Sequence, residues 1–71
     1  MFQQYFVNKQ AQANGDYEVH NYSCGYLIQM SPENKKSLGH FNNCGDAVTE
    51  ARKHHPTANG CFFCSKTCHT S

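Results

Sequence analysis

A shortage of large apolar side chains is the feature that most limits how this sequence can fold. The 71 residues include five Phe, three Val, two Leu and one Ile. A chain of this length forms one domain at most, and below about 70 to 80 residues a hydrophobic core rarely contributes more than about 3 to 5 kcal/mol. The formal net charge of only +1 argues against a disordered chain. We therefore expect a single folded domain, residues 1–71, that needs stabilisation beyond its apolar core.

Five Cys and five His are the residues that can supply this stabilisation. Residues 1–10 lack the cationic run, the long apolar stretch and the cleavage site of a signal peptide, so we predict a cytoplasmic protein. Thiols stay reduced in the cytosol, and an odd number of Cys leaves one over from complete disulfide pairing. These observations favour metal ligation over a framework of disulfides.

Charge and hydropathy restrict the classes of partner. No apolar run approaches the roughly 18 residues needed to cross a bilayer, and the mean hydropathy is -0.74, so no membrane partner is expected. Basic residues cluster only at Lys35-Lys36 and Arg52-Lys53, whereas a dedicated DNA-binding domain usually carries a strongly basic face. The charge pattern by itself therefore does not point to nucleic acid.

The amino-terminal half of the sequence predicts a β-hairpin. Residues 2–7 are aromatic and β-branched, and residues 17–20 alternate apolar and polar side chains. The dipeptide Asn14-Gly15 lies in the polar loop between them, and it adopts positive φ angles at little steric cost. A third short strand is expected over residues 37–41.

One helix follows the third predicted strand. Asn43 can accept a hydrogen bond from an early backbone N–H, and the carboxylate of Asp46 suits the first helical turn. Pro56 ends the helix because it disfavours α geometry at the residue before it. Asn59-Gly60 is predicted to be a turn. Residues at helical spacing form a narrow stripe that would face the sheet: Cys44, Ala47, Val48, Ala51 and His55. The expected fold is α+β, with a small antiparallel three-stranded sheet, one helix and a bound zinc ion.

The strongest motif is the pair Cys61 and Cys64, separated by two residues and preceded by a glycine. A tight turn at this spacing brings two sulfurs to one point, as a tetrahedral zinc site requires. The best remote partners are His20 and Cys24, at the end of the second predicted strand. A structural zinc contributes an apparent ~10 to 16 kcal/mol in small peptides, which exceeds what so few aliphatic side chains can provide. The predicted ligands are His20, Cys24, Cys61 and Cys64.

Several alternatives stay open at this stage. Cys68 or His69 could replace His20, because both lie close in sequence to the Cys pair, although a role in supporting the ligands from outside the coordination sphere or in tethering the chain end is favoured for them. Cys44 is expected to be a buried packing residue, with an activated thiolate at the helix start as the alternative. The Cys61/Cys64 pair could also be a redox-active dithiol or a disulfide.

The order of these residues resembles a known family. Val19-His20, Cys24, Asn34, Phe41, Asn43, Asp46-Ala47 and the closing Cys61-x-x-Cys64 resemble the amino-terminal zinc-binding domain of the bacterial methylphosphotriester repair protein Ada, over residues 17–64. The whole chain is also similar to small uncharacterised bacterial Cys/His-rich proteins. The resemblance implies zinc held by His20, Cys24, Cys61 and Cys64, and it implies proximity to nucleic acid. The methyl-accepting Cys of the repair domain is replaced by His20, so methyl transfer is not expected.

We accordingly predict a non-enzymatic, zinc-stabilised interaction module whose partner is a protein or a nucleic acid. Four protein ligands leave no open coordination position for a reacting water molecule. The alternative hypothesis, from another functional class, is a thiol-active redox or oxidant-sensing protein that uses the Cys61/Cys64 pair.

Overall fold

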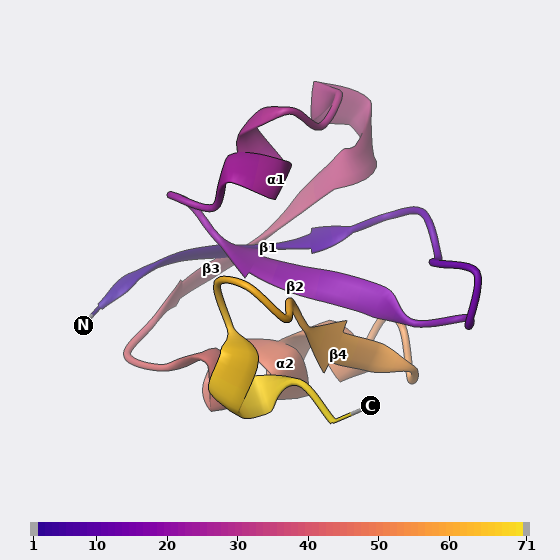
Figure 1. The fold of residues 1–71 in the computed structure, drawn as a ribbon. Helices are drawn as coiled ribbons and strands as arrows, with labels where there is room; N and C mark the ends of the chain where they lie inside the picture. The colour runs from indigo at the N-terminus through magenta and orange to yellow at the C-terminus, as the bar shows by residue number, and fades with distance from the viewer. Residues whose placement is uncertain (1, 71) are drawn as a thin grey trace.

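The computed structural model describes residues 2–70, which contain one four-stranded sheet (Figure 1). Its strands lie in the order β3, β1, β2, β4. The three longer strands pair antiparallel, whereas β4 runs parallel to β2 at the sheet edge. The strands are β1 (Gln3–Asn8), β2 (Tyr17–Asn21), β3 (Lys35–Phe41) and β4 (Ala58–Gly60).

The predicted hairpin is present as β1 and β2. The Asn14 side chain accepts a hydrogen bond from the Asp16 N–H at 3.0 Å, and Gly15 adopts a φ of 90°. Both features stabilise the predicted turn between β1 and β2, because Asn side chains form local hydrogen bonds in turns and Gly tolerates positive φ. The register places Phe6 opposite His20 and Val7 opposite Val19.

An irregularity interrupts the pairing of β3 with β1. Tyr5 pairs with Gly39 and the next residue, Phe6, pairs with Ser37, so Leu38 has no partner of its own across the ladder. Gly39 has a φ of 101°, which glycine adopts without a steric penalty. This bulge allows Leu38 to pack against the apolar core beneath the sheet.

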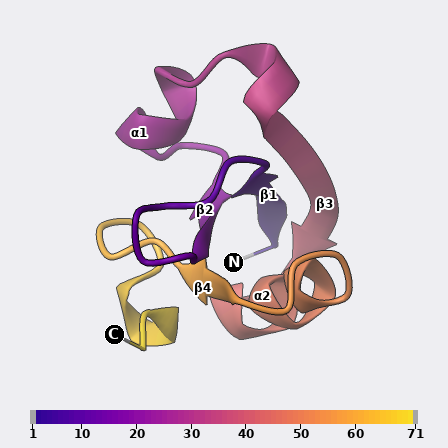
Figure 2. The ribbon, with the colours of Figure 1, turned by 90° about the vertical axis from the view of Figure 1, so that its right-hand side faces the viewer.

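Two helices lie on opposite sides of the strands (Figures 1 and 2). The four-residue α1 (Gly25–Ile28) follows β2, and α2 (Cys44–Arg52) follows β3. As expected, Asn43 caps α2, since its side chain accepts a hydrogen bond from the Asp46 N–H at 2.8 Å. Two short 3-10 turns, η1 (Pro32–Asn34) and η2 (Lys66–Cys68), complete the fold.

The sheet separates two small buried clusters. Side chains alternate between the faces of a strand, so neighbouring residues of β1 and β2 enter different clusters. The apolar cluster lies beneath α2 and contains Tyr5, Val7, Val19, Ala47, Val48, Ala51 and Ala58. The second cluster, with Phe6 and Met30 packed on it, lies beneath α1 and contains Cys24, Leu27 and Cys61.

The predicted three strands and single helix need correction. The structure adds β4 and α1, and β4 makes the sheet mixed rather than wholly antiparallel. The dipeptide Asn59-Gly60, which predicted a turn, lies in β4, where Val19 pairs with Gly60. A three-residue strand without apolar alternation has no periodic signal, and its pairing depends on a segment some forty residues away.

Gly60 occupies the most crowded glycine position among residues 2–70. A Cβ atom there would lie 2.7 Å from the Cβ of Cys68 and 2.8 Å from both the Cys68 carbonyl carbon and the Ser65 oxygen. We expect Gly60→Ala to lower the free energy of unfolding by about 1 to 3 kcal/mol, because backbone atoms must move to admit the methyl group. Denaturant unfolding measures this change. Gly25→Ala is the matched control, since nothing lies within 4 Å of its Cβ; equal stability of the two variants would contradict the prediction.

Candidate metal centre

The four residues predicted as ligands converge in the structure. The ligand atoms of His20, Cys24, Cys61 and Cys64 all lie within 4.8 Å of one another. His20 and Cys61 are each 1% exposed and Cys24 is 5% exposed, while Cys64 is half-buried. Three sulfurs and one imidazole nitrogen, drawn from opposite ends of the chain, could therefore hold one metal ion.

The end of β2 positions the first pair of ligands. His20 is the penultimate residue of the strand, and its side chain points to the face opposite Val19. The chain then reverses in a turn closed by the Cys24 N–H, which donates to the Asn21 carbonyl at 3.1 Å. Cys24 starts α1, and its carbonyl accepts from the Ile28 N–H at 3.1 Å. Strand, turn and helix start thus bring imidazole and thiol to the same place.

A second turn positions Cys61 and Cys64. The Cys61 N–H donates to the Val19 carbonyl at 2.9 Å, which extends the parallel pairing of β4 with β2 by one residue. The Ser65 N–H donates to the Cys61 carbonyl at 2.9 Å and closes the turn. Because β4 lies beside β2, its continuation delivers both sulfurs to His20.

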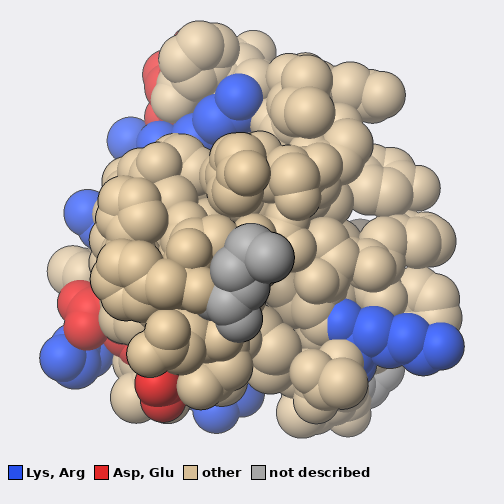
Figure 3. All heavy atoms as spheres, turned by 90° about the vertical axis from the view of Figure 1, so that its left-hand side faces the viewer, with Lys and Arg blue, Asp and Glu red and all other residues tan. Residues whose placement is uncertain are grey.

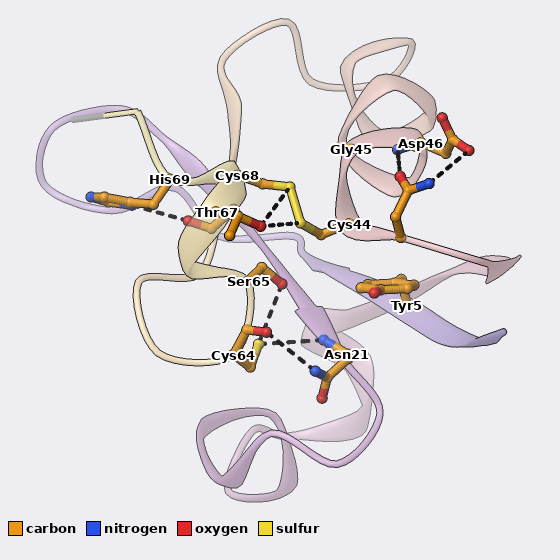
Figure 4. Close-up of a disulfide and its surroundings, with 12 residues drawn as sticks. Tyr5, Asn21, Cys44, Gly45, Asp46, Cys64, Ser65, Thr67, Cys68 and His69 are labelled. Atoms are coloured by element: carbon orange, nitrogen blue, oxygen red, sulfur yellow. Dashed lines mark hydrogen bonds between the residues drawn. A yellow bond between two sulfur atoms is a disulfide. The ribbon is translucent and has the colours of Figure 1, made fainter. Parts of the chain in front are cut away.

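Hydrogen-bond donors surround the Cys64 sulfur (Figure 4). The Asn21 backbone N–H lies 3.4 Å from this Sγ atom, and the Ser65 hydroxyl oxygen lies 3.6 Å from it. The Asn21 side-chain amide also donates to the Cys64 carbonyl at 3.3 Å. Donors of this kind stabilise a thiolate, which is the form of Cys that binds metal.

Burial governs the protonation of these groups in the absence of an ion. Desolvation raises the pKa of Cys61 and raises the pKa of Cys64 to about 12, against the lowering effect of hydrogen bonds to the sulfurs. Desolvation also lowers the pKa of His20 to about 4, so the imidazole is neutral near pH 7. A neutral imidazole is ready to ligate, and a bound cation would displace the thiol protons.

Cys44 and Cys68 form a disulfide that the sequence did not predict (Figure 4). The expected buried free thiol at Cys44 is thus wrong. Cys68 was expected to tether the chain end, and it does so by joining η2 to the start of α2. Both residues pack against the apolar cluster on the face of the sheet opposite the four ligands.

The structure places His20, rather than Cys68 or His69, with the three free thiols. Cys68 is consumed in the disulfide, and the Nδ1 atom of His69 lies 3.0 Å from the Gly60 carbonyl oxygen. The three free cysteines are Cys24, Cys61 and Cys64. Counting could have revealed the disulfide, because assigning three Cys and one His to a metal leaves Cys44 and Cys68 as a pair.

The disulfide bears on the predicted compartment. Disulfides persist in oxidising environments and are rare in the cytosol, where thiols are kept reduced. A disulfide such as Cys44–Cys68 is therefore unusual for a cytoplasmic protein. No helix formed by residues 2–70 has both the length and the apolar character needed to span a bilayer.

Exposed aromatic rings adjoin the four ligands. The rings of Tyr26 and Phe63 stack with centroids 4.9 Å apart, and Phe62 meets Phe63 edge-on at 5.2 Å. The ammonium group of Lys66 lies 5.8 Å from the Phe62 ring centroid. We call these four residues the aromatic surface. Beside it lies a cavity of about 370 Å³ lined by Cys24, Gly25, Tyr26, Gln29, Phe63 and Cys64.

Comparison of the chain with known protein families, curated proteins and solved structures finds no match. The resemblance to the Ada-like domain therefore rests on the sequence pattern alone. What the structure adds independently is the convergence of the four side chains.

Removal of the disulfide should weaken the fold without affecting the four ligands. The two Cys are 24 residues apart in the sequence, and losing such a crosslink costs about 3 kcal/mol, chiefly by freeing the unfolded chain. We expect Cys44→Ala/Cys68→Ala to lower the free energy of unfolding by this amount in denaturant titrations with excess zinc. A reductant should destabilise the wild-type chain similarly and leave the variant unchanged. An equal free energy of unfolding of the wild type with and without reductant would contradict the prediction.

Proposed function

We propose that the protein is a non-enzymatic interaction module stabilised by one zinc ion. The observation that carries the proposal is the mutual approach of the four ligand atoms within 4.8 Å. Three sulfurs and one imidazole form a donor set typical of structural zinc, which is tetrahedral. The two Cys of the tight turn, His20 near the end of β2 and Cys24 just after it would then complete the coordination sphere.

The composition of the second buried cluster supports a structural role for the ion. Its buried members are Cys24, Leu27 and Cys61, so among residues 2–70 Leu27 is the one large aliphatic side chain buried beneath α1. Zinc binding in small domains contributes on the order of 10 kcal/mol to folding. An ion at this position would supply the folding free energy that apolar packing on this face cannot.

The same coordination argues against metal catalysis. Catalytic zinc sites keep one position open for water or substrate, whereas His20, Cys24, Cys61 and Cys64 would fill all four. We therefore assign the biological activity to the protein surface and not to the ion.

The aromatic surface is the part of the molecule best suited to a partner. Tyr26, Phe62 and Phe63 are 53%, 48% and 67% exposed, although a chain so poor in apolar residues would be expected to bury its rings. Bases of single-stranded nucleic acid stack on such rings, and a nearby ammonium such as that of Lys66 attracts phosphate. Viewed from the side of the N-terminus, the molecule shows separate Lys and Arg side chains and no broad basic face (Figure 3). We propose single-stranded nucleic acid as the partner.

The thiol-active alternative is less well supported. A reactive Cys-x-x-Cys pair needs a thiol with a depressed pKa and access to its substrate. Here burial raises the pKa of both thiols, and Cys61 is 1% exposed. The arrangement favours sulfurs that bind a cation.

Metal analysis tests the proposal directly. Protein purified without added metal should contain about one equivalent of zinc, because a four-ligand site of this kind binds one ion tightly. Native mass spectrometry measures the stoichiometry, and far-ultraviolet circular dichroism should show loss of structure under a strong chelator. Cys64→Ser should lose the ion, whereas Cys44→Ala/Cys68→Ala, which also removes Cys side chains, should keep it.

Loss of the ion in Cys64→Ser could also result from a failure to fold. Cobalt substitution of the wild-type protein tests the site without a variant. Wild-type protein loaded with Co²⁺ should show the intense visible bands of tetrahedral coordination together with thiolate charge-transfer absorption. A metal-free wild-type chain that remains folded and binds no cobalt would refute the zinc proposal.

The aromatic surface should determine binding to nucleic acid. We expect labelled single-stranded oligothymidine to bind at low salt, and Phe63→Ala to weaken binding by about 1 to 3 kcal/mol, the contribution of one stacked base. Fluorescence anisotropy at several salt concentrations measures both effects. Phe2→Ala is the matched control, since Phe2 is 63% exposed but stacks on His40 and lines a different cavity from Phe63. Absence of binding at low salt would eliminate this partner.

A further inference from the structure

The imidazole of His20 has one ring nitrogen that faces the cluster and one that does not. Its Nδ1 atom lies 3.9 Å from the Cys64 sulfur. The residue is 1% exposed, and its Nε2 atom makes no hydrogen bond with any residue from 2 to 70. A buried polar nitrogen without a partner costs free energy, so something must satisfy it in the working protein.

Glu18 is the residue placed to do this. It lies on β2 two residues before His20, and side chains two apart share one face of a strand. Its carboxylate oxygen Oε1 lies 3.7 Å from His20 Nε2, slightly beyond a hydrogen bond, and the side chain is 21% exposed. A small rotation of the Glu18 side chain would close this gap without moving the backbone.

The pairing has a consequence for the tautomer of His20. A neutral imidazole carries its proton on one nitrogen and a lone pair on the other. A carboxylate beside Nε2 favours the proton at Nε2, which leaves the lone pair at Nδ1, the nitrogen that faces Cys64. Carboxylates that orient metal-bound histidines in this way are common in zinc sites.

We propose that Glu18 is a positioning residue of the metal centre: its carboxylate accepts the Nε2–H of His20 and directs Nδ1 to the ion. This inference rests on the proposed zinc function. Glu18 touches neither the ion nor its sulfurs, and it acts only through the imidazole.

Zinc affinity measured by chelator competition tests the role of the carboxylate. Glu18→Ala should weaken zinc binding about 10-fold to 100-fold, the usual loss when such an orienting partner is removed. Glu18→Gln should recover part of the affinity, since its amide oxygen still accepts a hydrogen bond. Glu33→Ala, which removes an exposed carboxylate from η1, is the matched control and should bind zinc as the wild type does.

The tautomer supplies a readout that a purely structural role would not change. In long-range ¹H–¹⁵N spectra of zinc-loaded protein, His20 should show a protonated Nε2 and a metal-bound Nδ1. The Nε2 proton should exchange with water faster in Glu18→Ala than in the wild type. Zinc bound through Nε2, or an unchanged affinity in Glu18→Ala, would overturn the inference and leave the zinc site standing. A wild-type chain that binds no zinc would instead defeat the proposed function itself.

Discussion

The alternation of side chains along β2 is the constraint on which the rest of the structure depends. Val19 enters the apolar cluster beneath α2, and His20, the next residue, enters the group of thiols beneath α1. Neither face of the sheet has enough large apolar residues to form a substantial core. Each face instead combines a few buried residues with sulfur chemistry, a disulfide on one side and a candidate metal centre on the other.

The carboxyl-terminal segment joins these two faces. It pairs with β2 through β4, turns at Cys61 and Cys64 beside His20, and then reaches α2 through Cys68. Gly60 makes this path possible, because Ser65 and Cys68 pack directly against its Cα position. A segment with little secondary structure of its own therefore reaches both faces of the sheet, one through Cys61 and Cys64 and the other through Cys68.

Local signals in the sequence were sufficient for the hairpin and for the start of α2, whereas α2 ends at Arg52, before the predicted end at Pro56, and excludes His55 from its stripe. Asn14-Gly15 and Asn43 act through hydrogen bonds to residues two or three positions away, so their effect can be deduced without knowing the fold. The grouping of His20 with Cys61 was also predictable. Each belongs to a closely spaced pair of candidate ligands, and a tetrahedral ion requires two such pairs. The parallel strand β4 was not predictable in this way, because it depends on which distant segments become neighbours. The pairing of Cys44 with Cys68 follows only once the other three Cys have been assigned to a metal.

The two-sidedness of β2 also restricts how the length of this chain can vary. Inserting one residue between Val19 and His20 would reverse the facing of all later positions in the strand relative to Val19. The imidazole would then face the apolar cluster, and the inserted side chain would take its place beside the thiols. An insertion in the loop formed by residues 9–16 leaves this facing unchanged. The interior of β2, in contrast, must keep its spacing so that Val19 stays in the apolar cluster and His20 stays beside the thiols.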